Sequence, residues 1–421
     1  MSDATLTPVA PVERIPAMDV LRGFALLGIL LMNIEAFVGP ILASQTGLDP
    51  RWQGVDRWAD ALVYILVQGK FYSLFSLLFG MGFAVMLERA QRAKRPFVAL
   101  YLRRTGGLLV IGMVHAVLIW SGDILIAYAL TSLPMLLFFR RTETDLLPIS
   151  ALGLYGVPVV AMLAMGVLGS IAQSEPQATA HFHEVMLGQA QAWHAWLELQ
   201  RTAYGGNDFA AAVVQRWGDL RGMFSFLPLF LGWLVLGLFL LGSWFVRSGA
   251  IARPQAFPLL YARLRHFGLP LGLGLMLVAF WLMPTNRPGR LDLVSGLANA
   301  LVLVSNVLMC LGYLAWIVRG LQSPRAARCL VWLAPAGRMA LTNYLTQSIV
   351  CVGIFYGYGL GYFDQLGRAW QVLFAFALFG AQVLVSRAWL ARFAYGPVEW
   401  VWRAVTYGHW PAMRRAAGVA T

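Results

Sequence analysis

A histidine and an aspartate that flank a short turn, His115 and Asp123, are the residues of this sequence best suited to chemistry. His115 lies near the end of one apolar segment, and Asp123 opens the next one. Because a tight turn brings two helix ends together, the carboxylate could hold the imidazole in one tautomer and make it a base near neutral pH. The alternative is structural: a histidine that packs by hydrogen bonding, and an aspartate that caps a helix.

A cation and an amide share one stripe of the first apolar segment. Asp19 and Arg22 are three residues apart and so lie on one helix face, and Asn33 falls close to the same stripe about 16 Å further along. Arg22 could bind an anionic group that enters from the cytoplasm, and the stripe could line a pathway. Alternatively, Asp19 complements the helix dipole and Arg22 extends to the membrane surface.

The second apolar segment contains Lys70, one of two lysines in the chain. Its ammonium group either reaches the outer interface or is buried and needs a partner. Further along, Gly80 and Gly82 permit close contact with another helix.

Two polar stripes mark a later apolar segment. Asn343 and Gln347 are four residues apart, as are Tyr344 and Ser348, so each pair shares a helix face. Polar stripes are unlikely to face lipid. They predict either hydrogen bonds between helices or the lining of a substrate cavity.

The C-terminal segment from Pro397 onward is typical of an amphipathic helix at the cytoplasmic membrane surface. Glu399 and Arg403 have the spacing of a helical ion pair, and Trp400 and Trp402 are suited to anchoring at the interface. We assign this segment a structural role.

The sequence predicts no metal site. Three histidines lie in one polar stretch, but no third ligand is spaced to complete a site around the His-x-His pair, and the three cysteines have no ligand spacing. These residues are His181, His183, His194, Cys310, Cys329 and Cys351.

The composition is that of a membrane protein. Of the 421 residues, 59% are hydrophobic and 12% are charged, whereas a soluble domain has roughly 25% charged residues. The net charge of +13 comes from basic residues between apolar blocks and not from a continuous basic face. Nucleic-acid binding is therefore not expected, and lipid is the expected partner.

Ten apolar segments are long enough, or nearly so, to cross a hydrocarbon core of roughly 30 Å as helices. They are residues 20–38, 61–87, 104–120, 122–139, 146–173, 223–246, 264–283, 293–318, 339–360 and 369–391. The predicted fold is therefore an all-α, polytopic transmembrane bundle of about ten helices.

The basic residues predict the topology. Arginines gather in alternate joints, at residues 89–104, 140–141, 247–265 and 319–338, while the joints at 121–122 and around 364 have few charges. Cytoplasmic loops retain Arg and Lys, so both termini are predicted to be cytoplasmic, in a multi-pass inner-membrane protein.

These segments predict five regions. A cytoplasmic tail (1–19) precedes an N-terminal half of five helices (20–173), and an external segment (174–222) with an interfacial helix or a compact loop follows. A C-terminal half of five helices (223–391) and a cytoplasmic amphipathic segment (392–421) complete the chain.

Five of these motifs, in this order, resemble the YeiB family of bacterial inner-membrane proteins over nearly the whole chain. The C-terminal half of that family is a domain of unknown function. The resemblance rests on residues 19–28 with Asn33, on residues 69–80, on His115 with residues 122–125, on residues 337–348 and on residues 396–400.

The YeiB family is distantly similar to transmembrane acyltransferases, including heparan-α-glucosaminide N-acetyltransferase and the sugar O-acetylases of bacterial envelopes. This resemblance implies that acyl-CoA from the cytoplasm donates an acyl group to an acceptor on the far side. The D-x-x-R-G element of those enzymes matches Asp19, Arg22 and Gly23. Their catalytic histidine does not match: the O-acetylases have it where this chain has Asn33, and in the heparan enzyme it follows shortly after an asparagine there. His115 is then the best-placed base.

Three functions remain open. In a transmembrane acyltransferase, Arg22 would grip the phosphates of acyl-CoA, His115 with Asp123 would deprotonate the acceptor, and Lys70 or Asn33 would stabilise the oxyanion. In a transporter or exporter of a small or lipid-like solute, these residues and Asn343, Tyr344, Gln347 and Ser348 would form the binding site. The third function is a non-catalytic membrane scaffold. No permanently bound cofactor is expected, and the acceptor (a small molecule, sugar or lipid) and self-association remain open.

Overall fold

The computed structural model describes residues 15–414, apart from the side chains of residues 176–178. The parts of the two predicted cytoplasmic tails at residues 1–14 and 415–421 lie outside the described residues. Within the described range, the predicted all-α, polytopic bundle is confirmed. Its α-helices are α1 (Pro16–Val38), α2 (Gly54–Leu66), α3 (Lys70–Arg92), α4 (Phe97–Leu118), α5 (Leu125–Pro134), α6 (Leu146–Ser174), α7 (Pro176–Gly205), α8 (Phe209–Phe226), α9 (Gly232–Arg247), α10 (Pro258–Arg263), α11 (Leu269–Leu282), α12 (Leu293–Gly320), α13 (Pro324–Leu330), α14 (Ala334–Arg338), α15 (Ala340–Phe355), α16 (Arg368–Arg392) and α17 (Pro397–Tyr407).

Each of the ten predicted spans corresponds to helix. Among residues 15–414, eight helical stretches are long and apolar enough to cross a membrane. The fourth and ninth predicted spans are the two shorter apolar helices, Leu125–Phe139 and Ala340–Phe355. The chain is therefore a multi-pass membrane protein with lipid around it.

The second predicted span is interrupted. α2 ends at Leu66, and α3 starts at Lys70 after a turn in which Gly69 has a φ of +83°. A side chain at Gly69 would lie 2.2 Å from the amide nitrogen of Asn306 on α12, so both the backbone conformation and the packing require glycine here. Lys70 thus begins a helix instead of lying within one.

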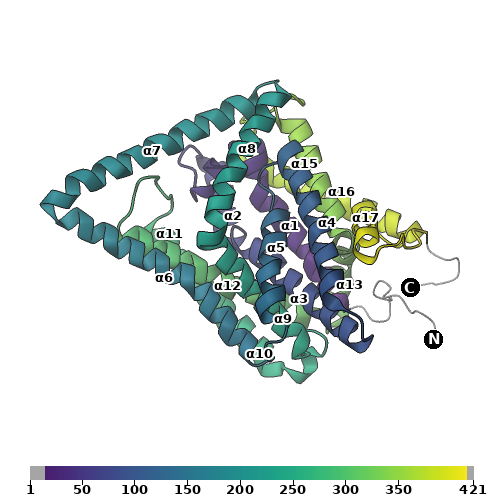
Figure 1. Ribbon diagram of the computed structural model, residues 1–421. Coiled ribbons are helices and arrows are strands. Elements are labelled where there is room, and N and C mark those ends of the chain that lie inside the picture. The colour runs from purple at the N-terminus through teal and green to yellow at the C-terminus, as the bar shows by residue number, and fades with distance from the viewer. Residues whose placement is uncertain (1–14, 415–421) are drawn as a thin grey trace.

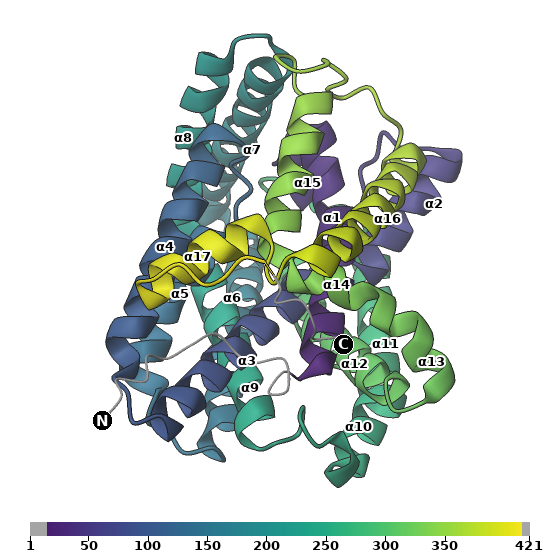
Figure 2. The same cartoon turned by 90° about the vertical axis from the view of Figure 1, so that its right-hand side faces the viewer.

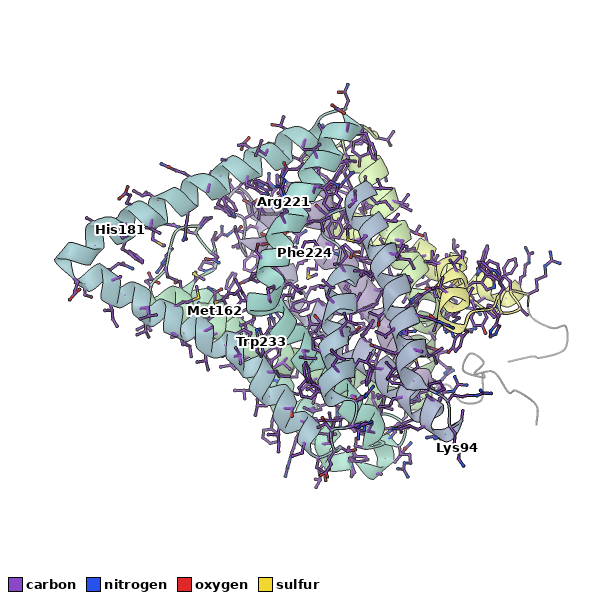
Figure 3. The ribbon with its side chains drawn as sticks, in the orientation of Figure 1. Lys94, Met162, His181, Arg221, Phe224 and Trp233 are labelled. Carbon is purple, nitrogen blue, oxygen red and sulfur yellow. The ribbon has the colours of Figure 1, made fainter. Side chains whose placement is uncertain are left out.

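The predicted external segment forms two helices. α6 and α7 meet at a vertex away from the bundle, and α7 returns to α8, so the three helices outline a wedge (Figure 1). In Figure 3, Met162 and His181 lie on the two arms of this wedge, and Arg221, Phe224 and Trp233 lie along α8 and the start of α9. One helical stretch, Phe209–Arg247, runs across the predicted boundary at residue 223.

Glycines set the closest helix contacts. A methyl group on Gly80 of α3 would lie 2.0 Å from the carbonyl oxygen of Phe239 on α9. One on Gly242 of α9 would lie 1.9 Å from the carbonyl oxygen of Leu77 on α3. The two backbones therefore touch at both points, as the sequence suggested for Gly80.

The amphipathic helix α17 runs across the bundle and packs on α4 (Figure 2). The indole nitrogen of Trp402 donates to the carbonyl oxygen of Arg104 at 2.8 Å. The start of α1 and the whole of α17 therefore lie at one end of the bundle, where both line the same cavity.

Candidate functional site

A cavity opens at the end of the bundle where α1, α3, α4, α14 and α17 meet. The volume of the cavity is about 270 Å³, near the lower end of the roughly 300–1,000 Å³ of pockets for drug-sized ligands. Its mouth is open, so part of a longer ligand can lie outside it.

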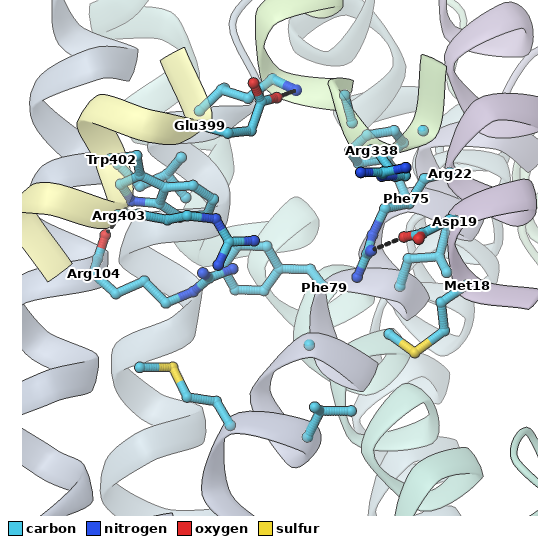
Figure 4. Close-up of a pocket in the computed structure, with 18 of the residues that line it drawn as sticks. Met18, Asp19, Arg22, Phe75, Phe79, Arg104, Arg338, Glu399, Trp402 and Arg403 are labelled. Carbon is cyan, nitrogen blue, oxygen red and sulfur yellow. Dashed lines mark hydrogen bonds and ion pairs between the residues drawn. The ribbon is translucent and has the colours of Figure 1, made fainter. Parts of the chain in front are cut away.

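The mouth of the cavity is strongly basic. Figure 4 shows the guanidinium groups of Arg22 and Arg338 on one side and those of Arg104 and Arg403 on the other, all turned toward one space. Arg89 of α3 also lines it, and the acidic lining residues are Asp19 and Glu399. Five guanidinium groups thus face two carboxylates.

Local contacts position these cations. Arg22 donates to Asp19 one turn earlier at 2.9 Å. The guanidinium of Arg104 stacks over the Trp402 ring at 3.9 Å, and that of Arg403 lies 4.8 Å from the Tyr395 ring centre. Stacking on aromatic faces leaves the guanidinium edges available for a planar anion.

Two glycines bring Arg22 and Arg338 together. A methyl group on Gly23 would lie 2.1 Å from the carbonyl oxygen of Leu333, and one on Gly337 would lie 1.9 Å from that of Asp19. α1 and the segment around α14 are therefore in backbone contact. The arginine beside each glycine then lines the same cavity wall.

Glu399 does not form the predicted ion pair with Arg403. Its carboxylate instead accepts hydrogen bonds from the backbone nitrogens of Leu341 and Thr342 and from the Thr342 hydroxyl, at 2.7, 3.0 and 2.6 Å. These nitrogens belong to the first turn of α15, so Glu399 caps that helix from another one. Burial raises the pKa of the Glu399 carboxyl above its ordinary value, and the hydrogen bonds from Thr342 and Leu341 oppose that rise.

Beyond the arginines the cavity becomes apolar. Its inner wall combines aliphatic and aromatic side chains from five helices and the turn before α5: Ile29, Phe75, Phe79, Leu108, Ile124, Leu125, Tyr128, Leu341 and Tyr344. A ligand that fits both parts has a polyanionic head and an apolar extension.

His115 and Asp123 are in contact, as the sequence predicted. The Nδ1 atom of His115 lies 2.7 Å from a carboxylate oxygen of Asp123, and both side chains are buried. The other carboxylate oxygen accepts from the backbone nitrogen of Ile126 at 2.9 Å. Asp123 therefore orients the imidazole and caps α5 at once. We assign the proton to Nδ1, since a carboxylate only accepts, and Nε2 is then the basic nitrogen.

Tyr344 lies between this pair and the cavity. His115 does not itself line the cavity, but the ring centre of Tyr344, which does, lies 5.2 Å from that of His115. The Nε2 atom of His115 and the Tyr344 hydroxyl are both buried without a hydrogen-bond partner among the described residues. Unsatisfied buried polar groups are rare in native proteins. A ligand group that binds there would supply the missing hydrogen-bond partners of these two atoms.

Asp219 of α8 forms hydrogen bonds that fix the turn around Asp123. Its carboxylate accepts from Ser121 in the turn at 2.8 Å. It also accepts from Trp196, Gln200 and Gln215 and from the Tyr204 hydroxyl. Hydrogen bonds among residues of α7 and α8 therefore hold the turn beside His115 in place.

Arg216 of α8 holds the end of α4. Its side chain is fully buried and donates to the carbonyl oxygens of Val117 and Leu118, at 3.5 and 3.3 Å, and to the Tyr358 hydroxyl. A cation at these last carbonyls suits the helix dipole. Arg216 and Asp219 were not predicted from the sequence, because both lie in a segment that was expected to be external.

Other predicted site residues lie away from the cavity. The stripe that starts at Arg22 lines the cavity as far as Ile29, one turn short of the half-buried Asn33. Lys70 is fully buried among α2, α3 and α11, where its Nζ donates to the Tyr64 carbonyl oxygen at 3.2 Å and lies 3.4 Å from the Met276 sulfur.

The two polar stripes of α15 have different surroundings. The Asn343 and Gln347 side chains donate to Ser386 and Gln382 of α16, each at 2.9 Å. This is the predicted hydrogen bonding between helices. On the neighbouring stripe, Tyr344 faces the cavity, and the buried Ser348 donates to the Tyr344 carbonyl oxygen.

Arg104, Arg338, Arg403 and Glu399 were not predicted as site residues. Arg104 and Arg338 were read as markers of cytoplasmic joints, and Arg403 and Glu399 as an ion pair of a surface helix. One signal was present: Gly337-Arg338 and Gly396-Pro397-Val398-Glu399 lie inside the motifs shared with the YeiB family. The structure describes no group of three or more metal-ligating side chains within residues 15–414.

The fold and the cavity define a class: polytopic α-helical membrane proteins with a basic, deep cavity at one end of the bundle. The chain belongs to the YeiB family. An Escherichia coli (strain K12) protein, "Uncharacterized protein YeiB", is 31% identical over 97% of this chain and 98% of its own length. A Bacillus subtilis (strain 168) protein, "Uncharacterized protein YxaH", is 34% identical over 99% of this chain and 100% of its own.

Residues 245–409 match the family described as "Protein of unknown function (DUF418)". The match runs from the last turn of α9 through α17, whereas the predicted C-terminal half is 223–391. No solved structure matches the chain.

Proposed function

We propose that this protein is a transmembrane acyltransferase of the bacterial inner membrane. Acyl-CoA enters the arginine-lined cavity from the cytoplasm, and its acyl group passes to a hydroxyl or amine of an envelope acceptor. Arginines from two of the arginine-rich joints support this orientation, because Arg89, Arg104 and Arg338 line the cavity.

The cavity matches the two halves of acyl-CoA. Arginine recognises phosphate through charged, paired hydrogen bonds, and five guanidinium groups at the mouth suit a ligand with several phosphates. The apolar inner wall suits the long arm and the acyl chain. Along α4, the distance from Arg104 at the mouth to His115 is about 16 Å, so one extended ligand can reach from Arg104 to Tyr344, which lies beside His115.

His115 and Tyr344 supply the chemistry. Because Tyr344 separates His115 from the cavity, this step requires the Tyr344 side chain to turn aside. Nε2 of His115 then takes the proton of the acceptor, whose oxygen or nitrogen attacks the thioester carbonyl carbon. The Tyr344 hydroxyl donates to the oxyanion. The carbon–sulfur bond then breaks, and the imidazolium returns its proton to the leaving thiolate, so that ester or amide and free thiol are formed.

One observation carries this proposal: five motifs far apart in the sequence meet around a single cavity. Each of the five motifs contributes residues that line the cavity. In the order of the motifs, these are Asp19 and Arg22, then Phe75 and Phe79, then Ile124 and Leu125, then Arg338 and Tyr344, and finally Glu399. Shared motifs that converge on one cavity favour a ligand over a purely structural role.

The test is acyl-CoA binding by the purified full-length protein. Arg22→Gln and Arg338→Gln are each expected to weaken binding about tenfold or more, since a hydrogen bond to a charged group contributes roughly 1.5–3 kcal/mol. Arg325→Gln changes an exposed arginine of α13 outside the cavity and is the matched control. Equal binding by all four proteins, or no binding by the wild type, would contradict the proposal.

The Gly82→Leu variant provides a second test of acyl-CoA binding. A Cβ atom at Gly82 meets nothing within 4 Å, and the residue lines the cavity. Leucine there should fill the cavity and abolish acyl-CoA binding while the protein stays folded. Gly106→Leu, at another glycine with open space but outside the cavity, should bind normally.

The cavity also favours a second function, the export of an amphipathic anion, because its basic mouth and apolar depth suit such a solute equally. An exporter would move a labelled solute across proteoliposomes and leave it chemically unchanged. A transferase would release free thiol from acyl-CoA. Flux that survives Asp123→Asn, without thiol release from the wild type, would favour the exporter.

A further inference from the structure

A cluster of buried charges lies at the opposite end of α1, about 20 Å along the helix from Arg22. Arg368 of α16 contacts Glu35 of α1 at 3.3 Å and Asp60 of α2 at 3.0 Å. The three residues are 1%, 5% and 2% exposed, respectively. The cluster shares no residue with the arginine cavity.

The charges in this cluster do not balance. The charged groups that face Glu35 are Arg368, Asp60, Asp49 and Arg51. Arg51 is already paired with two other carboxylates, Asp49 and Asp364, at 2.6 Å each. Arg368 therefore remains as the single cation for two buried carboxylates. Two carboxylates that share a buried site cannot both ionise readily.

The hydrogen bonds indicate which carboxylate takes the extra proton. Asp60 accepts from the Arg368 Nε atom and from the backbone nitrogen of Asp49, at 3.0 and 2.9 Å, and both bonds favour its ionised form. Glu35 has one contact to Arg368, and its second oxygen, Oε1, is buried without any partner among the described residues. An ionised oxygen left in that state is unfavourable.

A metal ion does not explain the imbalance. Within residues 15–414, no three or more His, Cys, Asp or Glu side chains are placed to hold one. A proton needs no coordination shell and fits a space that excludes water.

We propose that Glu35 is a proton-binding site and holds its proton at neutral pH. The cluster reaches the aqueous phase at this end of the bundle through Asp60, Asp49 and the partly exposed Arg51, which gives the proton a route to the surface. By the predicted topology, this is the outer side. The protein therefore binds a proton from outside the cell, independently of the acyltransferase proposal.

The site is coupled to the surroundings of His115. One residue after Glu35, the carbonyl oxygen of Ala36 accepts from the Trp120 indole at 3.3 Å. Phe37 packs on the same ring, 4.2 Å between centres, and Trp120 lies beside His115. Loss of the proton would leave two carboxylate anions around one guanidinium, and their repulsion would act on α1 next to these contacts.

Infrared spectroscopy of the purified full-length protein tests the proposal. Wild type at pH 7 should show the carbonyl stretch of a protonated carboxylic acid, which disappears on alkaline titration and is missing in Glu35→Gln. A wild-type protein without this band, or a Glu35→Gln variant that keeps it unchanged, overturns the proposal. Glu35→Gln mimics the neutral acid and should therefore fold normally.

Asp60→Asn tests the sharing of Arg368. With its competitor neutral, Glu35 should ionise more readily, and its band should titrate at a clearly lower pH. Titration at the wild-type pH would show that the two carboxyls do not share the cation, and would contradict the proposal. Spectra with and without sodium distinguish a proton site from a sodium site. The band of a proton site does not change when sodium is added, and a band that sodium removes would contradict the proposal.

Discussion

At His115, the decisive property is which ring nitrogen carries the proton. Asp123 fixes Nδ1 as the donor and leaves Nε2 basic. The sequence predicted this contact, because two helices joined by a short turn bring their ends together. The sequence could not show that Tyr344 separates the pair from a cavity, since the register of distant helices is set only by packing.

Asp123→Asn tests this geometry. Asparagine can still accept from Ile126 and cap α5, but it can present its amide to the imidazole and favour the wrong tautomer. Thiol release from acyl-CoA should fall by about 10²-fold or more while acyl-CoA affinity stays within about twofold. A parallel loss of affinity would point to a folding defect instead.

Glu399 gives a prediction of pH dependence. Because burial raises its folded-state pKa, the stability that it contributes is fully present below the unfolded value of roughly 4.3 and is lost as the pH rises through the folded value. The melting temperature of the wild type should therefore decline over that window, and the decline should be smaller in Glu399→Gln, where other buried acids such as Glu35 still contribute to it. An unchanged pH profile in the variant would refute this.

At the scale of helices, the contact between α3 and α9 depends on glycine. Gly80→Ala places a methyl group against the Phe239 backbone and should lower the free energy of unfolding by about 1–3 kcal/mol. Gly82→Ala, two residues away, faces open space and should be neutral or slightly stabilising. Thermal unfolding compares the two, and equal losses would contradict the observed packing.

The break between α2 and α3 shows what hydropathy does not resolve. Residues 61–87 are nearly continuously apolar, which predicted one span. The turn at Gly69 depends on the approach of Asn306 from α12, far along the chain. For the same reason, Lys70 could not be placed from the sequence, since its surroundings come from α2 and α11.

At the scale of the whole molecule, the fold was predictable because lipid allows few alternatives. Within the described residues, apolar length predicted the eight helical stretches that are long enough to cross a membrane, and also the two shorter apolar helices that contain α5 and α15. The site was predictable only in part. Arg22 and His115 stood out as polar groups within spans, whereas Arg104, Arg338 and Arg403 resemble ordinary cytoplasmic arginines until the helices assemble.

The native cysteines can test the predicted orientation. Cys329 of α13 is exposed, whereas Cys310 and Cys351 are buried. A membrane-impermeant maleimide should therefore label the protein in inverted vesicles and not in intact cells. Cys329→Ser should abolish this labelling, and labelling of intact cells would place α13 on the opposite side.

The helical stretch Phe209–Arg247, which contains a π-helical segment at Leu227–Leu231, has a mechanical consequence. Its first part contains Asp219, which binds the turn beside His115, and its last part lies against the α3 backbone that lines the cavity. A helical stretch of 39 residues is about 58 Å long. A displacement of the projecting wedge would therefore be transmitted along one stretch both to the turn beside His115 and to the cavity wall.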